Sequence, residues 1–202
     1  RGCSLGGDEG AGRVGMSNPN LDPCGYRALF CVYLAGGDGL FEKLILDHSN
    51  LSVTVEDGVA AIQVPEGVRY RGRLFMRPKE TGLLPLLELG AIDYLFIYRS
   101  VARQHGLHFL ELPDEVNLSR QSLAGRYGRV WVRQFCDKPG RSALIEAGPI
   151  LYGVTVPRGA PHPRLGGEFI RLLLSEAGRD ILEEFGPSPL SLAEKKSSGE
   201  DD

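Results

Sequence analysis

The chain has 202 residues, of which 42% are hydrophobic, and its formal net charge is −3. This length and apolar content suffice for one large or two small domains with buried cores. The small negative charge gives no general attraction to nucleic acid or to anionic membranes, and no apolar run approaches the length of a membrane span.

The first part of the chain predicts a strand, a polar loop and a helix. Residues 1–13 are rich in glycine and predict a flexible terminus, and Val14–Met16 predicts a short strand. Asp22 then precedes Pro23, a pattern typical of a helix N-cap followed by the first helical residue. The helix is therefore expected to begin at Pro23 and Cys24, with its unpaired N–H groups and dipole forming an anion site. An ordinary N-cap without a ligand is the alternative.

Short elements are predicted next. They are a helix over Leu40–Asp47 and strands over Ser52–Val55, Ala60–Val64 and Leu74–Met76. Three alternating arginines, Arg69, Arg71 and Arg73, stand before the last of these strands. They can steer an anion, but such a pattern more often lines a solvated edge, and the second interpretation is favoured.

The next stretch predicts a polar turn with Glu80, a helix over Thr81–Leu89, a buried strand over Ala91–Ile97, and Tyr98 at the end of that strand. In open α/β sheets, ligands bind beyond the carboxyl ends of the strands, where Glu80 and Tyr98 are expected. Two plainer roles stay open. Glu80 can simply complement the dipole of the following helix, and Tyr98 can form the rim of a core strand. Pro85 is expected to kink the helix or to shorten its first turn.

The second half of the chain continues the alternation of strands and helices. The pattern predicts a helix over Arg99–Gln104, strands over Leu107–Leu112, Arg129–Phe135 and Ile150–Val156, and helices over Glu168–Leu174 and Arg179–Phe185. Such alternation is typical of an α/β sheet protein.

Motifs of covalent catalysis are missing from the sequence. It contains no GxSxG, Walker or HExxH motif, and its four cysteines lack zinc-binding spacing. On one helix, Cys24 and Cys31 would stand about 10 Å apart along the axis, too far for a disulfide, so both are predicted to be free.

Three blocks carry a resemblance to a known family. They are SNPNLDPCGYRA (Ser17–Ala28), RPKETGLLPLLELGAIDYLFIYRSVARQHGL (Arg77–Leu107) and ILYGVTVP (Ile150–Pro157). In this order and composition they resemble the archaeal-type molybdate/tungstate-binding proteins, the solute-binding components of ABC transporters. The resemblance spans roughly Val14–Leu190. It implies an α/β fold of the periplasmic-binding-protein type II class, in which two lobes close on the oxyanion.

The resemblance also implies an oxyanion site. Asp22 and Glu80 match two carboxylates that approach the metal centre of the oxyanion, Tyr98 matches a residue that contacts the anion, and Pro23 and Cys24 stand beside Asp22, with Cys24 offering its backbone N–H. Two carboxylates would repel a dianion unless their oxygens bond to a hard, high-valent metal. Sulfate offers no such metal, so the same carboxylates would act against it. The resemblance thus implies tungstate or molybdate as the ligand, with no cofactor and no covalent step, so the protein is not expected to be an enzyme.

The domain organisation follows from the same resemblance. Residues 14–117 are expected to form lobe two, 118–149 to be crossover strands, 150–190 to be the returning part of lobe one, and 191–202 to be a disordered tail. Family members carry a further part of lobe one ahead of the first block. The chain is therefore expected to hold one near-complete lobe plus the C-terminal part of the other. The last strand and the closing helices are expected to expose apolar surface.

The function implied is capture of tungstate or molybdate and its delivery to an ABC transporter permease and ATPase. Such proteins work outside the cytoplasm, in contact with the membrane only through the transporter or a lipid anchor, for which Cys3 is a candidate. Three alternatives stay open: a truncated homologue that binds nothing, a cytosolic effector domain that senses an anion, and an enzyme acting on a small anion. The effector would need a helix-turn-helix, and the sequence shows none.

Overall fold

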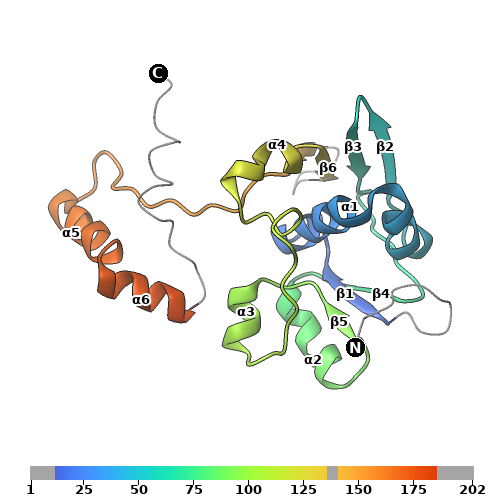
Figure 1. The fold of residues 1–202 in the computed structure, drawn as a ribbon, viewed down its shortest axis with the longest axis horizontal. Coiled ribbons are helices and arrows are strands. Elements are labelled where there is room, and N and C mark those ends of the chain that lie inside the picture. The colour runs from blue at the N-terminus through green and yellow to red at the C-terminus, as the bar shows by residue number, and fades with distance from the viewer. Residues whose placement is uncertain (1–11, 136–140, 186–202) are drawn as a thin grey trace. The chain divides into compact units, whose positions relative to one another are not determined.

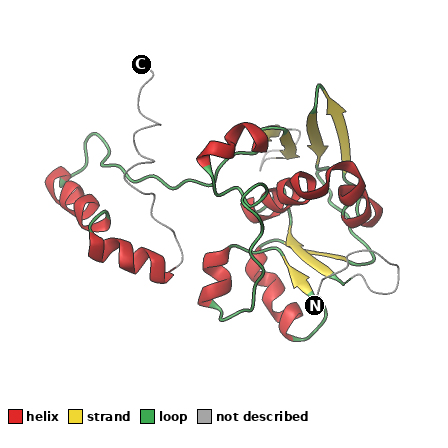
Figure 2. Cartoon of the chain, in the orientation of Figure 1, coloured by secondary structure: helices red, strands yellow, loops and turns green. Residues whose placement is uncertain are grey.

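The computed structural model of the chain describes residues 12–135 and 141–185 (Figure 1). These residues form two compact units. Unit 1 holds the described residues up to Ile97 and those from Glu111 to Ile150, and unit 2 holds Tyr98–Leu110 with the described residues from Leu151 onward. Helices and strands both occur, so the predicted α/β class is confirmed (Figure 2).

Some of the predicted segments lie outside the described residues. These include Cys3, the tail over 191–202, and all but the last two residues of the predicted flexible terminus 1–13. The lobe boundaries that the resemblance implies stay a prediction.

Three parallel strands form the first sheet of unit 1. β1 (Val14–Ser17) lies in the middle, between β4 (Leu74–Arg77) and β5 (Tyr94–Leu95). All four residues of β1 are buried, as expected for a central strand of a parallel sheet that is covered on both faces. The strands predicted at β1 and β4 are confirmed.

Four strands form the second sheet of unit 1. In spatial order they are β2 (Ser52–Glu56), β3 (Val59–Gln63), β6 (Val130–Phe135) and β7 (Ser142–Glu146). β2 and β3 form a hairpin through Asp57 and Gly58, whose φ angles of 51° and 76° are those of a mirror-image turn that matches the twist of the strands. β3 and β6 pair in parallel, and the other neighbours are antiparallel. The predicted strands at β2, β3 and β6 are confirmed. Two short helical turns, η3 (Gln121–Leu123) and α4 (Ala124–Tyr127), precede β6.

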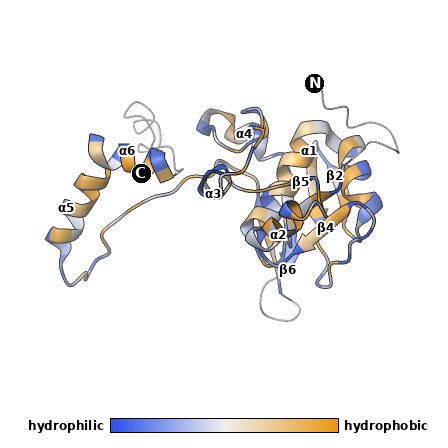
Figure 3. Ribbon diagram, turned by 90° about the horizontal axis from the view of Figure 1, so that it is seen from below, coloured by the Kyte–Doolittle hydropathy of each residue, from blue (hydrophilic) through white to orange (hydrophobic). Residues whose placement is uncertain are grey.

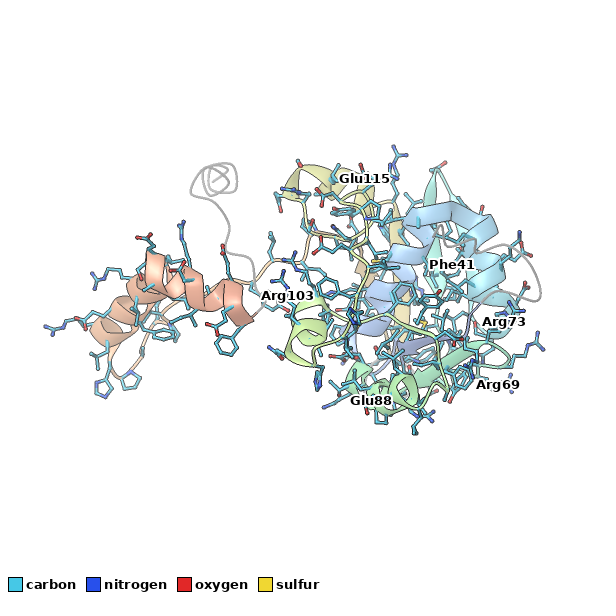
Figure 4. The ribbon with its side chains drawn as sticks, turned by 60° about the horizontal axis from the view of Figure 1, so that its bottom comes forward. Phe41, Arg69, Arg73, Glu88, Arg103 and Glu115 are labelled. Atoms are coloured by element: carbon cyan, nitrogen blue, oxygen red, sulfur yellow. The ribbon has the colours of Figure 1, made fainter. Side chains whose placement is uncertain are left out.

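α1 (Pro23–Leu44) is the helix around which unit 1 packs. It begins at the predicted residue, with Asp22 in an extended conformation as its N-cap. It contacts β1 of the first sheet and β6 of the second. Leu29 and Phe41 are fully buried in the core, and Figure 4 labels Phe41 there. Because the core draws on α1 and on both sheets, this one helix fixes the two sheets within the unit.

A kink divides α1 into two parts. Gly37 has φ 56° and ψ −151°, which is not helical geometry, and the helix then resumes up to Leu44. The separate helix predicted over Leu40–Asp47 is therefore the second part of α1, followed by the short turn η1 (Leu46–His48).

The helix predicted after β4 is split. The 3₁₀ turn η2 (Glu80–Leu83) comes first, and α2 (Leu84–Glu88) follows with Pro85 in its first turn. Proline is tolerated in the first turn because the N–H that it lacks has no helical acceptor there. Pro85 thus shortens the α-helix as predicted, and Glu80 becomes the first residue of η2.

Unit 2 consists of helices and extended connections. Its helices are α3 (Arg99–Gln104), α5 (Pro163–Leu173) and α6 (Glu176–Phe185). The side chain of Gln104 in α3 donates from Nε2 to the carbonyl of Phe185 in α6 at 3.3 Å. The helices were predicted, although α5 and α6 each begin earlier than expected.

Both α5 and α6 carry apolar as well as polar residues, as the colouring of Figure 3 shows. These apolar residues are largely exposed. Those exposed by more than half are Leu165, Phe169, Leu172, Ile181 and Phe185. No residue of α5 is buried, and Gly178 is the buried residue of α6. None of the described helices has the length and apolar character needed to cross a membrane.

Three strand predictions require correction. Leu107–Leu112 and Ile150–Val156 form no strand, and the strand expected over Ala91–Ile97 is reduced to the two residues of β5. Apolar runs alone do not make strands, because a strand needs a neighbouring backbone for its hydrogen bonds. Within the described residues neither of the first two runs forms a ladder of such bonds, although Ile150 donates to the carbonyl of Leu118 at 2.8 Å. Side chains such as Leu110 and Tyr152 are more than three-quarters exposed.

Candidate functional site

Two loops of unit 1 leave the same edge of the first sheet. β1 ends at Ser17, which pairs with Arg77 at the end of β4. The backbone N–H of Asn18 donates to the carbonyl of Arg77 at 2.8 Å, which continues the pairing one residue further. Because the strands are parallel, the loop that follows β1 and the turn that follows β4 begin side by side. The first carries Asp22 and the second carries Glu80.

The carboxylate of Asp22 connects these two segments. Its Oδ2 accepts a hydrogen bond from the backbone N–H of Glu80 at 3.2 Å, and its Oδ1 accepts from the backbone N–H of Cys24 at 3.5 Å. Both contacts are longer than a typical N–H···O bond, so both are weak. One side chain thus caps the long helix α1 and holds the first residue of η2.

The two carboxyl groups also influence each other. Partial burial acts to raise the pKa of the Asp22 carboxyl. Hydrogen bonds with the Glu80 carboxyl, the nearby Ser17 hydroxyl, and the backbone N–H groups of Glu80 and Cys24 together outweigh burial, so this pKa lies below its ordinary value. The pKa of the Glu80 carboxyl is raised, first by its hydrogen bond to Asp22 and then by burial. Of the two carboxyl groups, Glu80 is therefore the one that takes up a proton first as the pH falls.

Two asparagines fix the loop between Ser17 and Asp22. The Oδ1 of Asn18 accepts from the backbone N–H of Asn20 at 2.9 Å, a local turn typical of asparagine. The side chain of Asn20 then donates to the carbonyl of Pro65 at 2.8 Å and accepts from the backbone N–H of Phe135 at 2.9 Å. Pro65 lies just beyond β3 and Phe135 ends β6. The loop that carries Asp22 is thus tied to the second sheet.

Cys24 lies in the first turn of α1 with its side chain turned inward. Its Sγ is 3.6 Å from the carbonyl oxygen of Phe96, the residue that follows β5. Burial, then the nearby charges of Glu80 and Asp22, raise the pKa of this thiol to about 12. A neutral thiol at neutral pH is a poor nucleophile and a poor metal ligand. What Cys24 offers a ligand is its backbone N–H, the group expected from the sequence.

The remaining predicted residues have different surroundings. Pro23 is the first residue of α1 and has no N–H, so its part in the site is to set the direction of the helix. Tyr98 is the first residue of unit 2 and the N-cap of α3, and its carbonyl accepts the N–H of Ala102 at 2.9 Å. Its contact with an anion stays a prediction. The structure brings Asp22, Cys24 and Glu80 together within unit 1.

Chemically, the group combines two carboxyl groups with backbone N–H donors at a helix start. In the described ranges, no three His, Cys, Asp or Glu side chains come together as ligands for a bare metal ion. Backbone N–H groups at a helix start are donors that suit the oxygens of an anion.

Two structural features of the site were not predicted from the sequence. One is Ser17, which is fully buried beside Asp22 and Cys24. The other is the role of Asn20 as a link to β3 and β6. The SNPN segment carries a turn signal for its asparagines, but no sequence signal names their distant partners, because those bonds join segments far apart in the chain.

Comparison with known proteins extends these observations. A family model described as bacterial extracellular solute-binding protein matches residues 5–187. An uncharacterized solute-binding protein of Methanoculleus marisnigri is 41% identical over 182 residues, which are 88% of this chain and 51% of that protein. The molybdate/tungstate-binding protein WtpA of Thermococcus kodakarensis is 41% identical over 174 residues, or 84% of this chain and 47% of that protein. The protein of the same name from Pyrococcus abyssi is 40% identical over 173 residues, which are 84% of this chain and 48% of that protein.

The chain spans about half the length of the curated relatives that it matches. The matches include relatives of the kind that the three sequence blocks indicated, so the resemblance is confirmed. The mixed sheets and helices are consistent with a solute-binding protein fold. The family description implies a location outside the cytoplasm. The chain belongs to the bacterial extracellular solute-binding protein family.

Proposed function

We propose that this chain binds tungstate or molybdate through Asp22, Cys24 and Glu80, and that it serves an ABC transporter by passing the oxyanion to the permease and its ATPase. The observation that carries the proposal is the Asp22 carboxylate, which caps α1 and also accepts the N–H of Glu80 from the neighbouring loop. Two relatives that are named as molybdate/tungstate-binding proteins support the choice of ligand.

The chemistry of the site supports a metal-centred oxyanion over sulfate. The N–H groups at the start of α1, where the helix dipole is positive, suit the oxygens of a dianion. Two carboxylates nearby oppose any dianion, unless their oxygens bond to its central atom. Tungsten and molybdenum are large, hard centres that accept further oxygen ligands. Pro23 orients the helix start, and Tyr98 is proposed to donate its hydroxyl to the anion.

No cofactor and no covalent step are part of this proposal, since capture and release need only reversible contacts. The transporter would be the route by which the protein approaches a membrane. Attachment through a lipid on Cys3 belongs to the same proposal and concerns a residue outside the described ranges.

The test is calorimetric titration of the purified 202-residue chain with tungstate, molybdate and sulfate. Asp22→Asn keeps an oxygen that can cap α1 while removing the charge, and Glu80→Gln does the same for the second carboxyl. We expect the wild type to bind tungstate and molybdate but not sulfate. Each variant should lose at least tenfold in affinity, about 1.4 kcal/mol.

Glu88→Ala is the matched control. Glu88 is an exposed carboxylate in α2, the helix that follows Glu80, and its loss should leave affinity unchanged. No heat with tungstate or molybdate from a chain shown to be folded would contradict the proposal and favour a homologue that does not bind. Equal binding of sulfate would contradict the proposed role of the carboxylates.

A further inference from the structure

Ser17 is a buried polar side chain whose hydroxyl has no partner of normal hydrogen-bond geometry. Among the described residues it is the fully buried polar one, at 0% exposure, and its Oγ is the one buried side-chain oxygen or nitrogen without a hydrogen bond. Buried polar groups are nearly always hydrogen-bonded in native proteins, because an unpaired one costs free energy. An unpaired hydroxyl beside a candidate site therefore suggests that its partner changes when the site is filled.

The surroundings leave Ser17 no other position. It ends β1 in register with Arg77, and the N–H of the next residue is bonded to the carbonyl of Arg77. On the other side lies the first turn of α1. There Gly25 packs so closely on the carbonyl oxygen of Ser17 that a Cβ at this position would collide with it. The serine is held in place, and only its hydroxyl is free to rotate.

The neighbours of the hydroxyl are the groups of the proposed site. It lies beside the Asp22 carboxyl and the Cys24 thiol and affects the ionisation of both. In the structure, the carboxylate of Asp22 accepts the N–H groups of Cys24 and Glu80 at 3.5 Å and 3.2 Å. These N–H groups are also the donors that an oxyanion at the start of α1 would use. Asp22 and the anion thus compete for the same donors.

We propose that Ser17 is a positioning residue of the oxyanion site: when an anion takes the N–H groups of Cys24 and Glu80, the Ser17 hydroxyl donates to the Asp22 carboxylate and holds it toward the anion. This rests on the proposed function. A hydroxyl bonded to a carboxylate forms a short and strong hydrogen bond. The Ser17 hydroxyl, which lies near Asp22 without normal hydrogen-bond geometry in the structure, would reach that geometry when the anion is bound.

The test compares Ser17→Ala with the wild type in two measurements. The first is tungstate affinity by titration, which we expect to fall at least tenfold in the variant. The second is the thermal unfolding midpoint of the empty protein, which we expect to stay equal or to rise, because alanine removes an unpaired buried hydroxyl at nearly constant volume. A purely structural role predicts the reverse pattern, a lower midpoint with unchanged affinity for the folded fraction.

Ser49→Ala is the matched control. Its hydroxyl is satisfied, since it donates to the carbonyl of Ile45 at 2.7 Å and accepts the N–H of Leu51 at 3.3 Å. This variant should lower the unfolding midpoint and leave tungstate affinity unchanged. Ser17→Cys, kept reduced, is a second variant that retains a weak donor, and its affinity should lie between those of serine and alanine.

The outcomes separate the two proposals. A wild type that binds tungstate, together with a Ser17→Ala variant that binds it equally well, overturns the role of Ser17 and leaves the proposed function standing. Equal tungstate affinities of the Ser17→Ala and Ser17→Cys variants overturn the role of Ser17 as a hydrogen-bond donor. If neither variant folds, the role of Ser17 is in packing, and the proposal is overturned. A folded wild type that binds neither tungstate nor molybdate overturns both proposals.

Discussion

Gly25 decides how closely α1 approaches the loop that carries the candidate site. A Cβ built at this position meets backbone atoms, the carbonyl oxygen of Ser17 and, at 2.8 Å, the nitrogen of Pro19. Backbone atoms cannot turn aside as the end of a long side chain can. Position 25 therefore requires glycine because α1 contacts the backbone of the preceding loop there.

For Gly25→Ala we predict a loss of about 1–3 kcal/mol in the free energy of unfolding, the usual cost of forcing an extra methyl into a packed region. Denaturant unfolding followed by circular dichroism measures it. Gly125→Ala is the control, since a Cβ at Gly125 in α4 meets nothing within 4 Å. Equal effects of the two changes would show that the approach of α1 to Ser17 is not tight in solution.

The thiol of Cys31 gives a prediction about pH. Cys31 is free, as predicted, and packs against the core, and burial raises its pKa from 9.0 to about 12. At pH 8 its reactive thiolate is then roughly a thousandfold scarcer in the native state than in the unfolded chain. Alkylation of Cys31, followed by mass spectrometry of its peptide, should be slower in the native protein by about this factor, with denatured protein as the control.

The raised pKa of Cys31 also predicts how the stability of the protein changes with pH. The Cys31 thiol binds its proton more tightly in the native state than in the unfolded chain, and this difference adds to the free energy of unfolding. The contribution is complete below pH 9.0 and is lost as the pH rises toward about 12. Unfolding midpoints should therefore fall over that range. Rapid native alkylation at pH 8 would contradict the burial of this side chain.

At the scale of the element, the start of α1 was predictable and its kink was not. Asp22 and Pro23 specify a helix start through local geometry alone, which a sequence displays directly. Gly36, Gly37 and Gly39 all weaken a helix, but only Gly37 leaves helical geometry, with φ 56°. Packing of the second half of α1 on the core selects which glycine bends.

Gly37→Ala and Gly39→Ala should therefore change stability in opposite directions. A residue with Cβ pays about 1–3 kcal/mol to hold the positive-φ, extended conformation that Gly37 adopts, with φ 56° and ψ −151°. Gly39 has room for a Cβ and no positive φ, so alanine there should stabilise the helix by about 0.5–1 kcal/mol. Chemical denaturation of the two variants measures both. Stabilisation by both changes would show that the kink is absent in solution.

Strand prediction succeeded where a neighbouring strand exists within the described residues. The hairpin β2–β3 and the central strands β1 and β6 pair as their patterns indicate. Leu107–Leu112 and Ile150–Val156 have patterns as apolar as these and form no strand. The pattern reports a preference for burial, whereas a strand also needs hydrogen-bond partners that a short window of sequence does not contain.

At the scale of the whole molecule, the two units differ in how much they bury. The core cluster belongs to unit 1 and draws on α1, both sheets and the segment around Leu118 and Tyr127. In unit 2, Ala102 is buried in α3, while α5 has no buried residue. This agrees with the expectation that the closing helices expose apolar surface.

The rate of amide hydrogen exchange should therefore differ between the two units. We predict that peptides from α5 and α6 exchange quickly, while those from β3 and β6 at the centre of the second sheet exchange slowly, because local opening is easiest where few side chains are buried. Mass spectrometry of both sets of peptides in one sample supplies its own control. Equal protection of α5 and β3 would mean that the apolar faces of unit 2 are covered in solution.

The sequence by itself determined the α/β class, the start of α1 at Pro23, the family, and the candidate residues Asp22, Cys24 and Glu80. These depend on local geometry, periodicity and motifs, all of which are written along the chain. Only the tertiary structure decided that Asp22 accepts the N–H of Glu80, that Asn20 joins the loop to the second sheet, and that Ser17 is buried unpaired beside them. Each of these facts joins segments that lie far apart in the chain or depends on what surrounds a side chain, and only the folded protein provides either.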